Sequence, residues 1–114
     1  MEIKKWCVYS ADLSPRFGTE PGKLRPVVVI QTNLLNEADH PSTLICPLTT
    51  KVLPKIKWLR VHLEKNEGGL DKESDILVDQ IRAIDNRRFK TRMGMLRKAN
   101  QLPLIEGLKA VLDL

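Results

Sequence analysis

The stretch RPVVVIQ at residues 25–31 decides the fold of this chain of 114 residues. Its VVVI core is apolar at every position and rich in β-branched residues, which is typical of a strand buried on both faces. Because a residue before proline is pushed toward extended geometry, Arg25 should open this strand. The preceding SPRFGTEPGK, residues 14–23, contains glycines and prolines and predicts a loop. An arginine therefore stands where a loop enters a buried strand.

Short apolar runs bounded by glycine and proline extend this strand pattern along most of the chain. Further strands are expected at residues 6–13, 43–48, 58–63, 75–81 and 90–95. A turn is expected at residues 85–89. Five to seven short strands favour a small, strongly bent barrel, because closure removes exposed strand edges.

The C-terminal segment has a helical rather than an alternating pattern. Asn100 is the expected N-cap, and Pro103 falls in the first turn, where proline is tolerated. The apolar residues recur at helical spacing, and they are Leu102, Ile105, Leu108 and Leu112, supported by Leu104 and Val111. The fold class predicted from the sequence is therefore mainly β, with a C-terminal α-helix.

Length and composition indicate one domain, residues 1–114, with 42% hydrophobic residues to form its core. The net charge of +5, from 19 Lys+Arg and 14 Asp+Glu, favours an anionic partner such as nucleic acid. No stretch approaches the roughly 18 apolar residues that a membrane span needs. The N-terminus lacks the apolar region of a signal peptide, so we expect a cytoplasmic protein without a membrane partner.

The common catalytic and metal-binding motifs are absent from the sequence, so no metal and no cofactor are expected. Cys7 and Cys46 lie in apolar surroundings and are predicted to be buried free thiols. The carboxylates between residues 64 and 79 look like a solvated acidic face, and they are Glu64, Glu67, Asp71, Glu73, Asp75 and Asp79. His40 is expected to be solvated, whereas His62 should share a strand face with Arg60 and Trp58. An acid–base pair of the two histidines would require both within reach of one phosphate.

Arg25 has two interpretations. Its guanidinium presents a planar fork of donors that fits a phosphate and stays charged at any working pH. Alternatively, it forms a structural ion pair with a carboxylate such as Glu20 or Asp12. The segment PLTTK at residues 47–51 is similarly open, since its hydroxyls and its lysine could hold a phosphate or simply form a turn.

Four blocks in order resemble the MazF/PemK toxin family over almost the whole chain. They are YSADLSPRFGTEPGKLRPVVVIQ, CPLTTK, GLDKESDILVDQIRAIDNRR and the amphipathic C-terminal helix. The resemblance implies an SH3-like barrel that works as a homodimer. It also implies the toxin of a type II toxin–antitoxin system, a metal-independent and sequence-specific endoribonuclease that cleaves single-stranded RNA. The expected partners are single-stranded RNA, not DNA, and an acidic, partly disordered antitoxin.

The same resemblance assigns site residues by position. The catalytic arginine falls on Arg25 and the catalytic threonine on Thr49, although the neighbouring Thr50 could be confused with it. RNA-binding positions are predicted at Thr19, Glu20, Lys51 and Gln80. One departure is visible: Trp6 and Cys7 stand where family members often have a Gly-Asp pair.

Two other functions fit the same barrel, because fold alone does not fix function. The first is a non-enzymatic, CcdB-like toxin that binds and poisons DNA gyrase. The second is an inactive RNA-binding barrel that uses the six cations of RRFKTRMGMLRK, residues 87–98, along a phosphate backbone.

Overall fold

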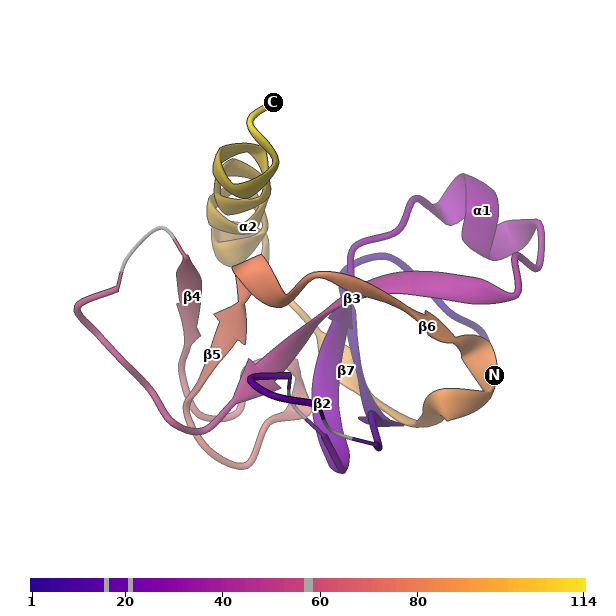
Figure 1. Cartoon of the computed structure of the whole chain (residues 1–114), viewed down its shortest axis with the longest axis horizontal. Coiled ribbons are helices and arrows are strands. Elements are labelled where there is room, and N and C mark those ends of the chain that lie inside the picture. The colour runs from indigo at the N-terminus through magenta and orange to yellow at the C-terminus, as the bar shows by residue number, and fades with distance from the viewer. Residues whose placement is uncertain (16, 21, 57–58) are drawn as a thin grey trace.

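The structure is a computed structural model that describes residues 1–15, 17–20, 22–56 and 59–114. Seven antiparallel strands form one bent sheet, in which β6 pairs with β3 beside the path β4-β5-β3-β2-β1-β7. The strands are β1 (Cys7–Asp12), β2 (Leu24–Val29), β3 (Ser42–Thr49), β4 (Arg60–Leu63), β5 (Ser74–Leu77), β6 (Arg82–Asp85) and β7 (Phe89–Met95). The chain ends in helix α2 (Lys98–Leu112). Figure 1 shows α2 on the side of β4 and β5, with the short helix α1 (Asn33–Glu37) on the opposite side. The predicted fold class is confirmed.

Strand β2 is buried on both faces, as its sequence predicts. Val28 packs into one apolar cluster with residues of β3, β4, β5 and α2. Val27 and Val29 pack into a second cluster on the other face, with residues of β1 and β3. The strand therefore separates the two halves of the core and holds its first residues, Leu24 and Arg25, at one end of the sheet.

Strand β3 explains why the sheet bends. One edge of β3 pairs with β2, while the other edge pairs with β6 over Ser42–Ile45 and with β5 at Leu48 and Thr49. Pro47 has no amide hydrogen to donate and falls in the gap between these two ladders. The chain bridges the same gap with the 3₁₀ turn η2 (Val78–Gln80).

The prediction of one strand over residues 75–81 is therefore wrong. Its polar Asp79 and Gln80 belong to the turn η2, where the chain leaves β5 before it enters β6. The predicted turn at 85–89 is found as η3 (Asn86–Arg88). Helix α1 was not predicted; Thr32 caps it by accepting a hydrogen bond from the backbone N–H of Leu34.

The N-cap of helix α2 is Arg97, three residues before the predicted Asn100. Asn100 is not the N-cap but lies inside the helix, and Pro103 lies in its second turn. Leu104 and Gly107 are buried, and Leu108 and Val111 pack on the same cluster. The predicted apolar face is wrong for two residues, Leu102 and Leu112, which are exposed because the stripe at 104, 108 and 111 turns toward the core.

A buried carboxylate takes the place of the missing helix cap. Glu67 of the 3₁₀ turn η1 (Glu67–Gly69) accepts hydrogen bonds from the backbone N–H and Nε of Arg97, at 3.2 Å each. It also accepts from the side-chain amide of Asn100 at 2.9 Å. Close glycine contacts press η1 against β7, since a Cβ on Gly94 would lie 2.5 Å from the carbonyl carbon of Gly68. We call this cluster the helix joint, and its residues are Glu67, Gly68, Gly69, Gly94, Arg97 and Asn100.

The first strand accommodates the departure at Trp6. Trp6 has φ 72°, in the left-handed region that glycine adopts most easily. Its backbone N–H donates to Val29 and its carbonyl accepts from Leu96, at 2.8 Å each. The glycine of the family pattern thus corresponds to a real backbone requirement that this chain meets with tryptophan.

Both thiols are free and buried, as predicted. Burial raises the pKa of Cys46 to about 12, so this side chain stays a neutral thiol. No helix among the described residues is long and apolar enough to cross a membrane.

Candidate active site

The ladder between β2 and β3 places Arg25 beside Thr49. In this ladder Val29 lies opposite Ile45, and Val27 lies opposite Pro47. Continued by two residues, the same register sets Arg25 opposite Thr49, and residues that lie opposite each other share a face of the sheet. A pocket of about 290 Å³ lies at this end of the sheet. Its lining residues are Lys23, Leu24, Arg25, Pro26, Leu48, Thr49, Thr50 and Ser74.

Arg25 is half-buried and is fixed by its own loop. Its Nε donates to the carbonyl of Gly22 at 2.8 Å, which leaves the two terminal nitrogens of the fork for other partners. Among the described residues, no carboxylate lies within ion-pair distance of Arg25. The alternative of a structural pair with Glu20 or Asp12 is therefore wrong for this structure, and Asp12 instead accepts from the backbone N–H of Ser14.

Thr49 is half-buried at the end of β3, and its hydroxyl oxygen accepts a hydrogen bond from the backbone N–H of Lys51 at 3.2 Å. This bond uses a lone pair of the oxygen and leaves the hydroxyl hydrogen free to donate. Thr50 also lines the pocket but is exposed. The segment therefore shows both turn chemistry and a hydroxyl available to a ligand.

The loop between β1 and β2 has a fixed stem and an exposed tip. The backbone N–H of Leu13 donates to the carbonyl of Lys23 at 2.9 Å, and Arg88 donates to the carbonyls of Asp12 and Ser14. A second hollow of about 300 Å³ borders this stem and shares Lys23 and Arg25 with the first. Arg25 therefore lines both hollows.

The predicted RNA-binding residues do not line the pocket around Arg25. Thr19 and Glu20 are exposed at the tip of the loop. Lys51 is exposed next to Thr50, and Gln80 lies in η2, which packs against α2, β3 and β4. Their roles in binding RNA stay predictions. Of the predicted site residues, the structure brings Arg25 and Thr49 together in the pocket.

Sequence reasoning missed a polar network beside Thr49, centred on Asp75 of β5. Asp75 lies opposite Thr49 in the β3–β5 ladder and opposite His62 in the β4–β5 ladder. Burial raises the pKa of Asp75, but hydrogen bonds from Leu53, His62 and Arg60 outweigh burial and lower the pKa overall. No local sequence pattern marks Asp75, because its partners come from β4 and from the segment at Leu53.

The prediction of a solvated acidic face is wrong for Asp75 and Glu67. Both carboxylates are buried and are saturated by hydrogen bonds from neighbouring cations and amides. Three exposed residues, His62, Glu64 and Glu73, bring donor atoms within 4.8 Å of one another. Exposed acidic groups commonly cluster without an ion, so we assign no metal site there.

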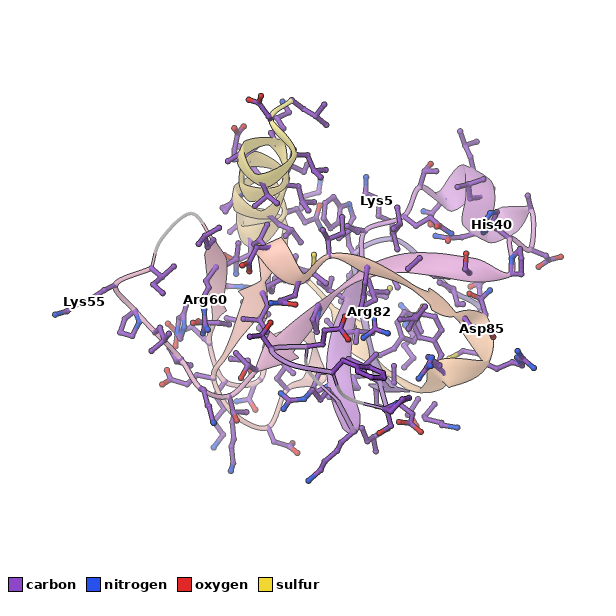
Figure 2. The ribbon with its side chains drawn as sticks, viewed as in Figure 1. Lys5, His40, Lys55, Arg60, Arg82 and Asp85 are labelled. Carbon is purple, nitrogen blue, oxygen red and sulfur yellow. The ribbon has the colours of Figure 1, made fainter. Side chains whose placement is uncertain are left out.

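The two histidines lie far apart. His40 is exposed, with its Nδ1 2.9 Å from the carbonyl of Ser42 at the start of β3. His62 lies on β4, opposite Asp75. Figure 2 shows His40 and the β4 residue Arg60 on opposite sides of the molecule. The two histidines therefore cannot act as an acid–base pair within one chain.

Half of the basic run at residues 87–98 is tied to the protein itself. Arg87 forms two hydrogen bonds with Asp85, Arg88 holds the loop stem, and Arg97 binds Glu67. Lys90 and Arg92 are exposed on β7. These contacts disfavour a continuous phosphate-binding track along the run.

Comparison with known proteins identifies the family. Residues 4–112 match the family described as "PemK-like, MazF-like toxin of type II toxin-antitoxin system". The chain belongs to this family. The MazF-type chain is also 35% identical over 112 residues to Endoribonuclease MazF of Staphylococcus epidermidis, which covers 98% of this chain and 92% of the relative.

Solved structures support the fold of the MazF-type chain. The crystal structure of MazF from Deinococcus radiodurans matches with a TM-score of 0.84 at 20% identity, and covers 100% of this chain and 99% of that one. A mycobacterial endoribonuclease in complex with its cognate antitoxin matches with a TM-score of 0.75 at 17% identity, and covers 96% and 94%.

These comparisons confirm the predicted class of protein, a MazF-type endoribonuclease toxin of a type II toxin–antitoxin system. They favour it over the gyrase poison and over the inactive RNA-binding barrel. Arg25 and Thr49 both line one pocket, and their catalytic roles stay predictions.

Proposed function

We propose that the pocket between β2 and β3 cleaves single-stranded RNA in a sequence-specific manner, with Arg25 and Thr49 as the catalytic residues. One observation carries this proposal: the β2–β3 register sets a fork of donors opposite a free hydroxyl at the end of the sheet.

The proposed reaction uses the 2′-hydroxyl of the substrate as its nucleophile, which explains a preference for RNA over DNA. The 2′-oxygen forms a bond to phosphorus, the bond to the 5′-oxygen breaks, and a 2′,3′-cyclic phosphate and a 5′-hydroxyl result. Negative charge builds on the phosphate oxygens during this step. Arg25 stabilises that charge, and the hydroxyl of Thr49 donates a further hydrogen bond.

The residues that line the pocket include no histidine and no carboxylate among those the structure describes. Arginine hardly gives up its proton, so Arg25 acts by its charge rather than as an acid. Positioning and electrostatic stabilisation therefore supply most of the rate. The reaction needs no metal ion.

Two partners complete the proposal. A homodimer is expected from the family resemblance, and sedimentation at micromolar concentration should show it; a clean monomer would contradict it. An acidic, partly disordered antitoxin is expected to lie across the hollows around Arg25. A related mycobacterial endoribonuclease has been solved with its cognate antitoxin, which supports this expectation.

The proposal is tested with purified protein and a mixed-sequence single-stranded RNA in EDTA. Wild type should cut the RNA and leave cyclic phosphate ends. Arg25→Ala should lower the cleavage rate by a factor of about 10² or more. Arg87→Ala is the matched control, because Arg87 is 91% exposed and pairs only with Asp85. Intact RNA with wild type, or equal cleavage by Arg25→Ala, would show that the proposal is wrong.

A further inference from the structure

The polar network around Asp75 holds the backbone that follows Thr49. Asp75 is buried, and one of its oxygens accepts from the backbone N–H of Leu53 at 2.9 Å and from Arg60 at 3.2 Å. Its other oxygen lies 3.1 Å from Nδ1 of His62. A carboxylate with three donors around it is fully satisfied and fixed in place.

Arg60 links Asp75 to the backbone next to Thr49. The same terminal nitrogen that binds Asp75 also donates to the carbonyl of Lys51 at 2.8 Å. Arg60 is only 17% exposed, so its side chain is confined between the carboxylate and this carbonyl. Asp75 and Arg60 together therefore fix the chain at two points, two and four residues after Thr49.

The fixed backbone in turn orients the catalytic hydroxyl. Lys51 uses its carbonyl for Arg60 and its N–H for the hydroxyl oxygen of Thr49. Because that oxygen accepts from Lys51, the hydroxyl hydrogen has to point elsewhere, and the pocket around Arg25 is open to it. The direction of the Thr49 donor thus depends on where the Lys51 peptide stands.

We propose that Asp75 and Arg60 are positioning residues for RNA cleavage, which hold the Lys51 peptide so that the Thr49 hydroxyl donates to the scissile phosphate. This inference rests on the proposed function of the Arg25–Thr49 pocket. Neither residue touches the RNA in this account. Misplacement of a catalytic donor by about 1 Å can cost on the order of 10²-fold in rate.

The test uses single-turnover cleavage of the same RNA by the full chain. Asp75→Asn replaces an acceptor oxygen with a donor, and Arg60→Met removes the forked donor but keeps the apolar stem. Each should lower kcat about 10-fold to 100-fold with KM little changed. Glu73→Gln is the matched control and should keep the kcat of wild type, because Glu73 is exposed and contacts only the outer nitrogen of His62.

A double-mutant cycle with Thr49→Val separates positioning from a general structural role. If the network acts through Thr49, then Asp75→Asn or Arg60→Met should cause no further loss of kcat in the Thr49→Val background. Independent, multiplying losses would overturn the inference. Urea midpoints identify a variant that fails to fold. Asp75→Asn and Arg60→Met lie on different strands, so the cycle can be completed with whichever of the two folds.

The failure of this inference differs from the failure of the proposed function. If wild type does not cut RNA, or if Arg25→Ala cuts as well as wild type, the proposed function is wrong. If cleavage depends on Arg25 while Asp75→Asn and Arg60→Met both keep the wild-type kcat, the positioning inference alone is wrong.

Discussion

Two buried carboxylates, Glu67 and Asp75, have different roles in this molecule. Glu67 joins η1 to the start of α2 in the helix joint, where its partners are the backbone N–H and Nε of Arg97 and the side-chain amide of Asn100. Asp75 lies beside the active site, where its partners fix the segment after Thr49. Similar contacts therefore hold the scaffold together at Glu67 and, in our proposal, position a catalytic group at Asp75. Changes at the helix joint should lower stability and leave the activity per folded molecule unchanged. Changes near Asp75 should lower activity more than they lower stability.

The largest effect is expected from Gly69→Ala in the helix joint. Gly69 has φ +75°, and a Cβ there would lie 2.1 Å from the carbonyl oxygen of Met93. The strained backbone and the clash should lower the free energy of unfolding by about 3 kcal/mol, measured by urea denaturation. Gly18→Ala is the control, because Gly18 also has positive φ but nothing within 4 Å, and it should cost only about 1 kcal/mol. Equal losses would contradict the role given to the close contact.

Glu67→Gln should have the next largest effect. The amide keeps the size of the side chain but replaces one acceptor oxygen with a donor that faces Arg97 or Asn100. We expect a loss of about 2–3 kcal/mol in the free energy of unfolding, with unchanged kcat per folded molecule. Thermal and urea unfolding measure the first quantity and single-turnover cleavage the second. The control is Glu64→Gln at an exposed position, which should change the free energy of unfolding by no more than about 0.5 kcal/mol. A lower kcat per folded molecule for Glu67→Gln would contradict the separation of stability at the helix joint from activity near Asp75.

Thr49→Val should have the converse effect. Valine keeps the branched shape at the end of β3 but removes the hydroxyl donor, so kcat should fall about 10²-fold while the urea midpoint changes little. Thr50→Val, one residue away on the exposed side of the pocket, should lose much less. The opposite order of the two variants would assign the catalytic hydroxyl to Thr50.

The smallest effect concerns the pH dependence of stability. Because the pKa of Asp75 is lowered below the value of 3.8 of a free carboxyl, its ionised form stabilises the folded state. That contribution is complete above pH 3.8 and is lost as the pH falls through the lower, folded pKa. The difference in unfolding free energy between wild type and Asp75→Asn should therefore narrow from pH 7 to pH 3. A difference that is constant across this range would contradict the ionised state of Asp75.

Sequence reasoning reaches the parts of the fold that depend on local pattern. The β-branched run at 27–30 and the turn at 85–89 follow from short-range rules, and the structure agrees with them. Arg25 lies at the start of this strand as its second residue, because β2 begins at Leu24. It fails where a distant residue decides the outcome. Asn100 looks like a helix cap by sequence, yet Glu67, more than 30 residues away, supplies the capping contacts and the helix starts earlier.

The same limit applies to the site. Arg25 and Thr49 could be paired from the resemblance, and the β2–β3 register supports their meeting. Asp75 could not be placed, because its surroundings depend on β4, β5 and the returning segment at Leu53. A carboxylate in a charged stretch reads as solvated until the strand register is known.

The central claim is that the scissile phosphate lies between Arg25 and Thr49. The most direct measurement is a crystal structure of the protein with single-stranded RNA made uncleavable by a 2′-deoxy substitution at the cleavage position. We expect a phosphate of this RNA to contact the Arg25 guanidinium and the Thr49 hydroxyl, with the Lys51 carbonyl still bonded to Arg60. A bound RNA whose cleavage-site phosphate lies away from the β2–β3 pocket, for example along β7, would contradict it.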